Sequence, residues 1–132
     1  MAELVICEGG SDLQLEPSQN STFLYRIGSC VVSGREVIEI NDPARLNAIA
    51  IEIRDEYSQW IYSINKLFLQ NKIVLKNLSL FFLTDLSCKR LEFFRTYDAI
   101  CNLILIQEKM ENIEVNKIIV SGVTSEFLQA CM

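Results

Sequence analysis

The sequence of 132 residues contains no histidine. This absence excludes a Ser-His-Asp or Cys-His catalytic group, a histidine-ligated metal and a histidine-based pH switch, unless another chain supplies the imidazole. Two nucleotide-binding patterns are missing as well. Without G-x-x-x-x-G-K-[ST] the chain is not a P-loop nucleotidase, and Gly9-Gly10 lacks the G-x-G-x-x-G spacing of a dinucleotide site. Carboxylate chemistry, which needs no histidine, stays open.

Positive charge is scarce. The chain has 12 Lys and Arg residues against 17 Asp and Glu residues, a formal net charge of -5 at pH 7. This balance argues against a general nucleic-acid-binding protein. No stretch approaches the roughly 20 consecutive apolar residues of a membrane span, and residues 1–8 lack the basic region that begins a signal peptide. We therefore expect no nucleic-acid partner and no transmembrane segment.

Cysteine occurs five times, without a C-x-x-C pair. An odd number with this spacing fits neither a disulfide framework nor a zinc site. Most of these thiols lie in or beside apolar runs, where free cysteine packs as a small hydrophobic group. The pattern predicts a reduced, cytoplasmic protein without metal or cofactor. Only Cys88, beside Lys89 at an expected helix start, is placed for a lowered thiol pKa, and alone it does not predict a thiol enzyme.

Short strands are predicted near the N-terminus. Residues 2–7 form an apolar run that ends in the turn Glu8-Gly9-Gly10, and the polar residues 11–21 predict a loop. Three further segments have the composition of short strands, namely residues 22–27, 30–32 and 35–40. Ser33-Gly34 predicts a hairpin between the last two. No internal repeat is expected.

Two long helical patterns follow. Asn41-Asp42-Pro43 combines an Asx cap with proline at the first helical position. Apolar residues then recur at three- and four-residue steps, which predicts one long helix over residues 43–69. A second pattern of this kind begins at Leu91 and ends near Met110.

Strand and helix alternate in the C-terminal half. Residues 78–83 are typical of a central strand buried on both faces, residues 117–120 predict another strand, and residues 124–126 begin a final helix. This order predicts a βαβ unit. We therefore expect an α/β fold: a single three-layer Rossmann-like domain over residues 1–132, with a mainly parallel sheet, two long helices and a short β-hairpin near the N-terminus. Because the final helix stops soon after it begins, the chain is interpreted as an N-terminal fragment of a larger two-domain protein or as a compact remnant of one.

The richest candidate site is residues 84–90, because ligands of open α/β sheets bind beyond the carboxyl ends of the strands. Asp85 is either a general base that deprotonates a hydroxyl or the cap of the following turn. Ser87, Lys89 and Arg90 surround the start of the second long helix, where free N–H groups and two cations favour a phosphate or carboxylate. The alternative is a solvated helix start whose cations pair with acidic neighbours.

Two turns complete the predicted substrate-binding site. Gly9 and Gly10 follow the first strand, and Ser121 follows the strand at residues 117–120. Glycine lets a ligand approach the backbone closely. We expect all three residues to contact the substrate.

Residues 53–68 (IRDEYSQWIYSINKLF) and 78–106 (LSLFFLTDLSCKRLEFFRTYDAICNLILI) resemble the N-terminal region of bacterial surface-carbohydrate biosynthesis proteins, glycosyltransferases of lipopolysaccharide and capsule assembly. The resemblance implies two Rossmann-like domains that face each other across a cleft, with the sugar-nucleotide donor bound mainly by the C-terminal one. This chain would then be the acceptor-side domain, with Asp85, Lys89 and Arg90 lining the cleft. No family motif maps onto it residue by residue.

Two classes of function follow. The first is a glycosyltransferase, whole or truncated, that uses a nucleotide sugar to build a surface polysaccharide. The second is a non-catalytic α/β module that binds a protein partner or a small anionic ligand. In either class a lone domain would be able to form a homodimer through an uncovered sheet edge or helix face. A reading frame that continues past Met132 into a second α/β domain would favour the enzyme.

Overall fold

The computed structural model describes the backbone of residues 1–10, 12–76, 78–83, 91–123 and 125–131. The chain divides into two compact units. The first unit consists of Met1–Pro43 together with Leu103–Met132, and the second unit consists of Ala44–Asn102. The long helix α3 (Leu91–Met110) belongs to the second unit as far as Asn102 and to the first unit from Leu103. Within the described part of the chain, no helix is both long and apolar enough to cross a lipid bilayer.

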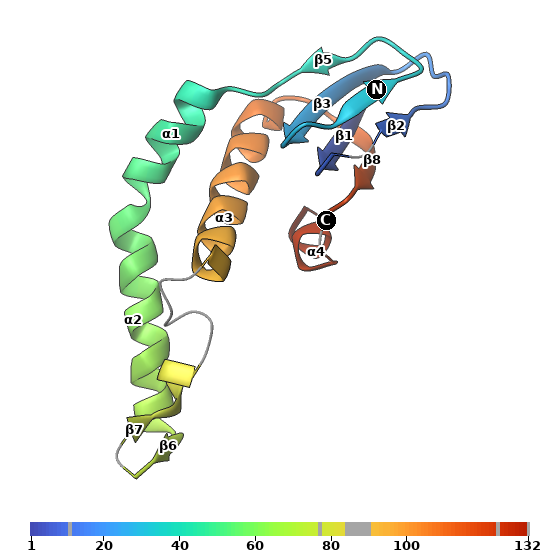
Figure 1. Ribbon diagram of the computed structural model, residues 1–132. Coiled ribbons are helices and arrows are strands. Elements are labelled where there is room, and N and C mark those ends of the chain that lie inside the picture. The colour runs from blue at the N-terminus through green and yellow to red at the C-terminus, as the bar shows by residue number, and fades with distance from the viewer. Residues whose placement is uncertain (11, 77, 84–90, 124, 132) are drawn as a thin grey trace. The chain divides into compact units, whose positions relative to one another are not determined.

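A parallel sheet organises the first unit (Figure 1). Its four strands are β1 (Ala2–Glu8), β3 (Ser21–Ile27), β5 (Ile38–Glu39) and β8 (Val115–Ser121). They lie in the order β5-β3-β1-β8, and every neighbouring pair is parallel. The predicted α/β class with a mainly parallel sheet is therefore confirmed.

The connections from β1 to β3 and from β3 to β5 contain short strands instead of helices. These are β2 (Asp12–Gln14) and β4 (Val31–Ser33), which pair in parallel as a separate sheet. Ala2 pairs with Ser21 in one sheet and Asp12 with Val31 in the other, an offset of 19 residues in both cases. The backbone pairing of the first unit thus recurs at one offset, although the sequence itself shows no repeat.

The hairpin predicted across Ser33-Gly34 is wrong. β4 pairs with β2 and β5 pairs with β3, so the strands on either side of this turn belong to different sheets. Gly34 has φ +105°, and a Cβ there would lie 2.2 Å from the carbonyl oxygen of Leu15. The Leu15 N–H donates to the carbonyl of Ser33 at 2.8 Å. The Ser33-Gly34 turn therefore packs against Leu15. The chain passes from one sheet to the other at this turn and does not fold back as a hairpin.

Apolar side chains join the two sheets of the first unit. Val5, Leu15 and Leu24 are buried together. Further apolar residues pack against them, namely Leu13, Val32, Val37 and Ile119. The opposite face of β1 is buried as well, at Leu4 and Ile6. Residues 4–7 of β1 form a continuous apolar run, which is typical of a strand covered on both faces.

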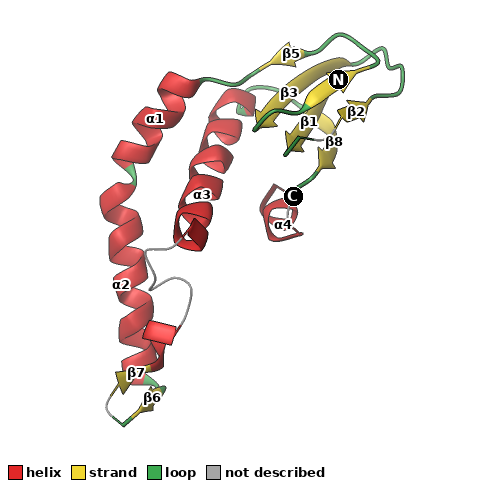
Figure 2. Ribbon diagram, in the orientation of Figure 1, coloured by secondary structure: helices red, strands yellow, loops and turns green. Residues whose placement is uncertain are grey.

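The single long helix predicted over residues 43–69 is interrupted once (Figure 2). The structure has α1 (Pro43–Glu52) and α2 (Arg54–Gln70). Ile53 separates them with φ -91° and ψ -2°. Its N–H donates to Ile49 O at 3.0 Å, and its carbonyl accepts the N–H of Tyr57 at 2.9 Å. Helical hydrogen bonding thus continues across the break, and the start at Pro43 is confirmed.

The central strand predicted at residues 78–83 is wrong. β6 (Val74–Leu75) and β7 (Leu78–Ser79) form a small antiparallel hairpin, and Leu80–Leu83 form a 3₁₀ helix. The Ser79 hydroxyl donates to Asn65 Oδ1 at 2.8 Å and accepts the N–H of Phe81 at 3.3 Å. A serine side chain that bonds the backbone two residues onward favours a turn over an extended strand. β8 pairs with β1 instead, so the predicted βαβ unit is also wrong.

The loop predicted over residues 11–21 is wrong in part, because it contains β2, whose backbone pairs with β4. The last two helices agree with the sequence. α3 begins and ends as predicted, and α4 (Ser125–Cys131) follows β8. In the second unit Tyr97 of α3 packs against Tyr57 with ring centroids 5.0 Å apart, and its hydroxyl donates to the carbonyl of Ala50. In the first unit the C-terminal part of α3 buries Leu105 and Ile106.

Candidate functional site

The carboxyl ends of the parallel strands meet at one edge of the sheet. Cys7 of β1 lies beside Arg26 of β3 on one side and beside Ser121 of β8 on the other. Gly9 and Gly10 directly follow β1. The structure therefore brings three of the predicted ligand contacts, Gly9, Gly10 and Ser121, to the same edge.

The other predicted site residues are Asp85, Ser87, Lys89 and Arg90. They lie outside the described residues, as does Cys88. The site that the described residues build is consequently the carboxyl edge of the sheet in the first unit.

The strand order creates a topological switch at this edge. From β1 the chain moves through β3 to β5 on one side, and β8 later pairs with the other side of β1. Ligands of open parallel sheets bind at such a switch, beyond the carboxyl ends of the two strands that flank it. Here those strands end in the turns Gly9-Gly10 and Ser121-Gly122.

The turn after β8 approaches the end of β1 closely. Gly122 has φ +77°, and a Cβ there would lie 2.2 Å from the carbonyl oxygen of Glu8. Only glycine fits without moving the backbone. Gly10 differs, because the nearest atom to a Cβ there would be Ser29 Oγ at 3.9 Å, and at Gly9 no atom would lie within 4 Å. The turn after β1 thus has open space on the side where a side chain would project.

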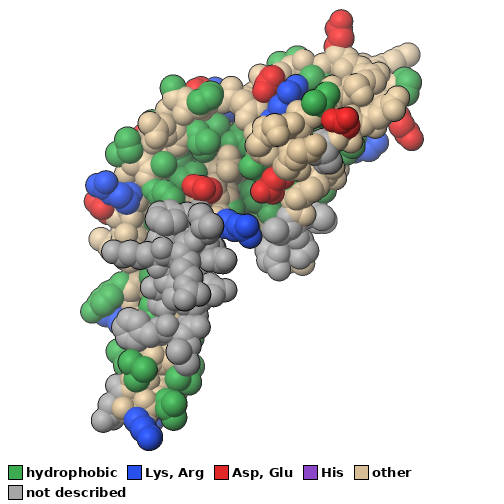
Figure 3. Space-filling model, in the orientation of Figure 1, with side chains coloured by type: hydrophobic (Ala, Val, Ile, Leu, Met, Phe, Trp, Pro, Cys, Tyr) green, Lys and Arg blue, Asp and Glu red, His purple; other side chains and the backbone are tan. Residues whose placement is uncertain are grey.

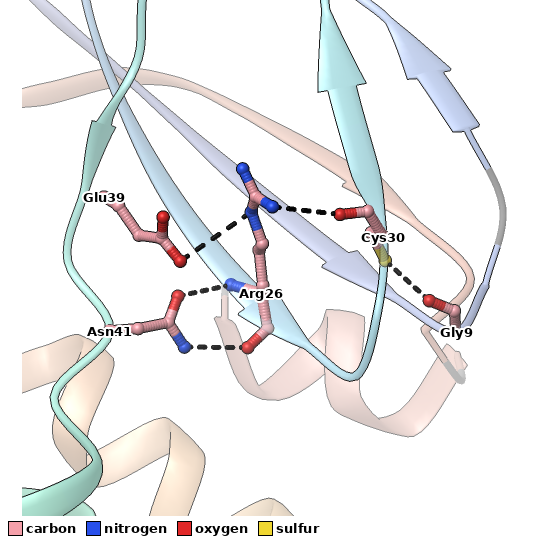
Figure 4. Close-up of polar contacts among 5 residues, drawn as sticks. All are labelled: Gly9, Arg26, Cys30, Glu39 and Asn41. Atoms are coloured by element: carbon pink, nitrogen blue, oxygen red, sulfur yellow. Dashed lines mark hydrogen bonds and ion pairs between the residues drawn. The ribbon is translucent and has the colours of Figure 1, made fainter.

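Arg26 is a fixed cation at this edge (Figure 4). Its Nη1 donates to the carbonyl of Cys30 at 3.2 Å, and its Nε lies 3.7 Å from Glu39 Oε1. Asn41 holds the backbone of the same residue: Oδ1 accepts the Arg26 N–H and Nδ2 donates to the Arg26 carbonyl, both at 2.8 Å. The Arg26 side chain is 33% exposed. A guanidinium held in this way presents oriented N–H donors to an anion.

Two buried thiols lie behind the glycine turn. The Cys30 thiol donates to the carbonyl of Gly9, with Sγ 2.9 Å from the oxygen (Figure 4). Burial, followed by the hydrogen bond with Cys30, raises the pKa of Cys7 to about 11. This shift disfavours the thiolate, which is the reactive form of cysteine. Both residues act as packing and hydrogen-bonding groups.

Two carboxylates that follow or belong to β5 are engaged in ion pairs. Glu39 faces Arg26, and Asp42 Oδ2 lies 2.9 Å from Lys109 Nζ. Among the described residues, no group of three His, Cys, Asp or Glu side chains is arranged to hold a metal ion. This edge offers a partly exposed cation, Arg26, which is paired with Glu39, and a glycine turn that is linked to it through Cys30.

Sequence reasoning missed Arg26 and Asn41. β3 was interpreted from its apolar content, although side chains alternate along a strand and Arg26 shares a face with buried Leu24. The alternation along β3 therefore indicates that the Arg26 side chain lies on the same face as Leu24, toward the neighbouring sheet. Asn41 carried no such signal, because Asn-Asp-Pro is typical of a helix cap.

The edge geometry defines a class of ligand and no particular molecule. The strand switch, the open glycine turn and Arg26 are the observations on which a function must rest. Comparisons with known proteins add no further ones: no protein-family model matches the chain, and no curated protein or solved structure matches it significantly.

Proposed function

We propose that the chain is the acceptor-side domain of a bacterial glycosyltransferase that uses a nucleotide sugar to build a surface polysaccharide. The observation that carries the proposal is the strand switch between β1 and β8, which is flanked by Gly9-Gly10 and Ser121-Gly122. Ligand-binding α/β domains use this position. The reaction class comes from the resemblance of residues 53–68 and 78–106 to surface-carbohydrate biosynthesis proteins. In this proposal the domain is cytoplasmic and three-layered in the Rossmann manner, and a second domain binds most of the donor.

The predicted residues divide the work between chemistry and binding. Asp85 deprotonates the attacking hydroxyl of the acceptor, which is a role that a carboxylate performs without histidine. Ser87, Lys89 and Arg90 bind the phosphate or carboxylate of an anionic sugar at a helix start. The glycine turns leave room for the sugar against the backbone.

Arg26 supports an anionic ligand independently of those residues. Its guanidinium is oriented by Cys30 and Glu39 and is partly exposed, and Cys30 in turn bonds Gly9 of the turn after β1. A charge-assisted hydrogen bond contributes about 1.5–3 kcal/mol. Replacement of Arg26 by glutamine should therefore weaken ligand binding by roughly ten-fold or more.

Titration of isotope-labelled protein by NMR tests the proposal. UDP-sugars, CMP-sugars and inorganic phosphate are added separately, and the amide signals of Gly9, Gly10 and Ser121 are followed. We expect a sugar nucleotide to move all three, and Arg26→Gln to reduce the shift. Arg54→Gln serves as the control, because Arg54 belongs to the second unit and its side chain is 72% exposed. Unmoved signals with every ligand would contradict the proposal.

A non-catalytic module that binds a small anionic ligand or a protein is the second candidate. The oriented guanidinium of Arg26 favours this module, because Arg26 would be able to bind an anion without any catalytic group nearby. A transfer assay with the product of the complete reading frame separates the two candidates. Transfer that is abolished by Asp85→Asn supports the enzyme. Ligand binding without transfer supports the module, for which we also propose a homodimer.

A further inference from the structure

Exposed apolar side chains gather at one end of the second unit. We define the hairpin tip as residues 66–76 and 78. These residues lie at the end of α2 and in the hairpin of β6 and β7. Leu75 and Leu78 are 62% and 51% exposed. Further exposed large apolar residues of the tip are Leu67, Leu69, Ile73 and Val74. Figure 3 shows hydrophobic side chains together with basic ones at this end of the unit. An apolar cluster of this kind marks a binding surface when it is contiguous.

The strand pairing orients the two most exposed leucines. Leu75 pairs directly with Leu78, so both side chains lie on the same face of the hairpin. Val74 pairs with Ser79, and the Ser79 hydroxyl bonds Asn65 of α2. The face that carries Ser79 therefore points to α2. Leu75 and Leu78 point away from α2, toward solvent.

The charge around the tip is of one sign. No Asp or Glu occurs from Tyr57 to Thr84, a stretch that contains Lys66, Lys72 and Lys76, although the whole chain has a net charge of -5. Lys72 and Lys76 directly flank the exposed residues 73–75. Their positions are fixed by turns, because both lysines have positive φ, 56° and 48°. The tip thus presents apolar side chains between two cations.

This combination favours a negatively charged, apolar partner. A second copy that docked tip to tip would bring lysines against lysines, because the tip contains no acidic residue. A membrane surface satisfies both properties: leucines enter the acyl boundary while lysine ammonium groups, on their flexible stems, reach the lipid phosphates. Each lysine near an anionic membrane strengthens binding, and the attraction is lost at high salt.

We propose that the hairpin tip docks onto an anionic lipid surface, with Leu75 and Leu78 inserted and Lys72 and Lys76 at the headgroups. The docking is peripheral, through a loop between helices, and is consistent with the finding that no described helix spans a bilayer. It goes beyond the proposed sugar-nucleotide site and does not depend on it, because the tip belongs to the second unit and the candidate site to the first.

Co-sedimentation with vesicles tests this docking. One set of vesicles contains phosphatidylcholine alone, and the other an equal mixture of phosphatidylcholine and phosphatidylglycerol. We expect the protein to sediment with the mixed vesicles at low salt and to be released at high salt. No binding to the mixed vesicles, or equal binding to both sets, would overturn the proposal.

Matched variants locate the contact. Leu75→Asp should reduce vesicle binding by at least about ten-fold, because the leucine no longer enters the apolar layer. Ile51→Asp is the control: Ile51 is 65% exposed but lies in α1, outside the tip. Equal losses in both variants would overturn the proposal.

A second pair of substitutions protects the test against misfolding. Lys72→Asn with Lys76→Asn removes both charges and keeps a residue type that tolerates positive φ. This double variant should lose roughly 25-fold in binding to the mixed vesicles, about five-fold for each lysine. Circular dichroism verifies that the helices persist. If Leu75→Asp instead abolishes a concentration-dependent self-association seen by analytical ultracentrifugation, and vesicles are not bound, a second copy occupies the tip and the proposal is wrong.

Discussion

The two units differ in how their exposed apolar residues are distributed. In the first unit Val5, Leu24 and Ile6 are completely buried, and even the charged side chain of Glu3 is only 6% exposed. In the second unit Trp60, Tyr62 and several tip residues face solvent. Val31, Ile38 and Ile118 of the first unit are exposed as well, so the difference between the units is the clustering of exposed apolar residues at the hairpin tip. Burial in the first unit provides stability, whereas the exposed surface of the second is available for binding.

Polar groups show the same contrast. Glu3 Oε2 lies 2.7 Å from Arg35 Nη1, and both side chains are nearly buried. Ser18 and Asn20 also bond the Glu3 carboxylate, at 3.3 and 3.2 Å. Both of these hydrogen bonds reach Oε1, so Glu3 Oε2 is held by the ion pair with Arg35 alone. In the second unit the pair Arg54 and Asp55 is exposed at 3.8 Å, where such pairs contribute little.

The largest expected effect tests this contrast directly. Leu24→Ala, which empties a fully buried position between the sheets, should lower the free energy of unfolding by about 2–5 kcal/mol. Leu75→Ala, at an exposed position of the hairpin tip, should change it by less than about 0.5 kcal/mol. Urea denaturation measures both. Similar losses in the two variants would show that the tip is packed, and the comparison of the units would fail.

The second largest effect is expected where the turn after β8 lies close to the end of β1 in the first unit. Gly122→Ala places a Cβ against the Glu8 carbonyl at positive φ, so we expect a loss of roughly 1–3 kcal/mol in unfolding free energy. Gly10→Ala has room for its methyl group and serves as the control, with a change near zero. Thermal unfolding followed by circular dichroism compares them. An undisturbed Gly122→Ala protein would mean that the two turns are not in contact.

A smaller effect sharpens the description of the second unit. Tyr97→Phe removes the hydroxyl that donates to the Ala50 carbonyl and should destabilise the protein by about 1 kcal/mol. Tyr62→Phe removes an exposed hydroxyl on α2 and should have almost no effect. Chemical denaturation of both variants distinguishes an interior hydrogen bond from a surface group. A neutral Tyr97→Phe would indicate that α3 is not held to α1 by this bond.

The smallest expected effect is a pH dependence of the first unit. The Asn20 hydrogen bond and then Arg35 lower the pKa of Glu3, against the opposing effect of burial. A carboxyl whose folded pKa is depressed stabilises the protein above its unfolded pKa of about 4.3 and loses this contribution as the pH falls through the folded value. Glu3→Gln should therefore flatten the acid limb of a melting-temperature curve. Glu36→Gln, at an exposed site, should leave the curve unchanged.

Local signals predicted most of the elements. The helix start at Pro43, the end of α3 near Met110 and the apolar core of β1 follow from patterns within a few residues. The partners of the strands do not. Between residues 2–20 and 21–39 only Gly9 and Gly28 are identical at the 19-residue offset, so the recurrence of the pairing is carried by shape and apolar character with almost no identity. The strand predicted at residues 78–83 was wrong for a related reason. The hydrogen bond from Ser79 to Asn65 of α2 is a contact between distant residues, and no local pattern in the apolar run indicates it.

The candidate site was predictable in part. Gly9, Gly10 and Ser121 could be placed because each follows a strand, and parallel strands end at a common edge. Arg26 could not, since its role depends on Glu39 and on the carbonyl of Cys30, contacts that no local pattern encodes.

The side chain of Asn41 has a consequence for how the protein avoids aggregation. β5 is the edge of the four-stranded sheet and has only two residues, so the backbone of β3 would be unpaired beyond it. The Asn41 amide bonds both the N–H and the carbonyl of Arg26, as a further strand residue would. Open strand edges recruit strands from other chains, and natural proteins block them with short or covered edges. Asn41 thus acts as a terminator of sheet growth, and a homodimer formed through this edge would first have to displace it.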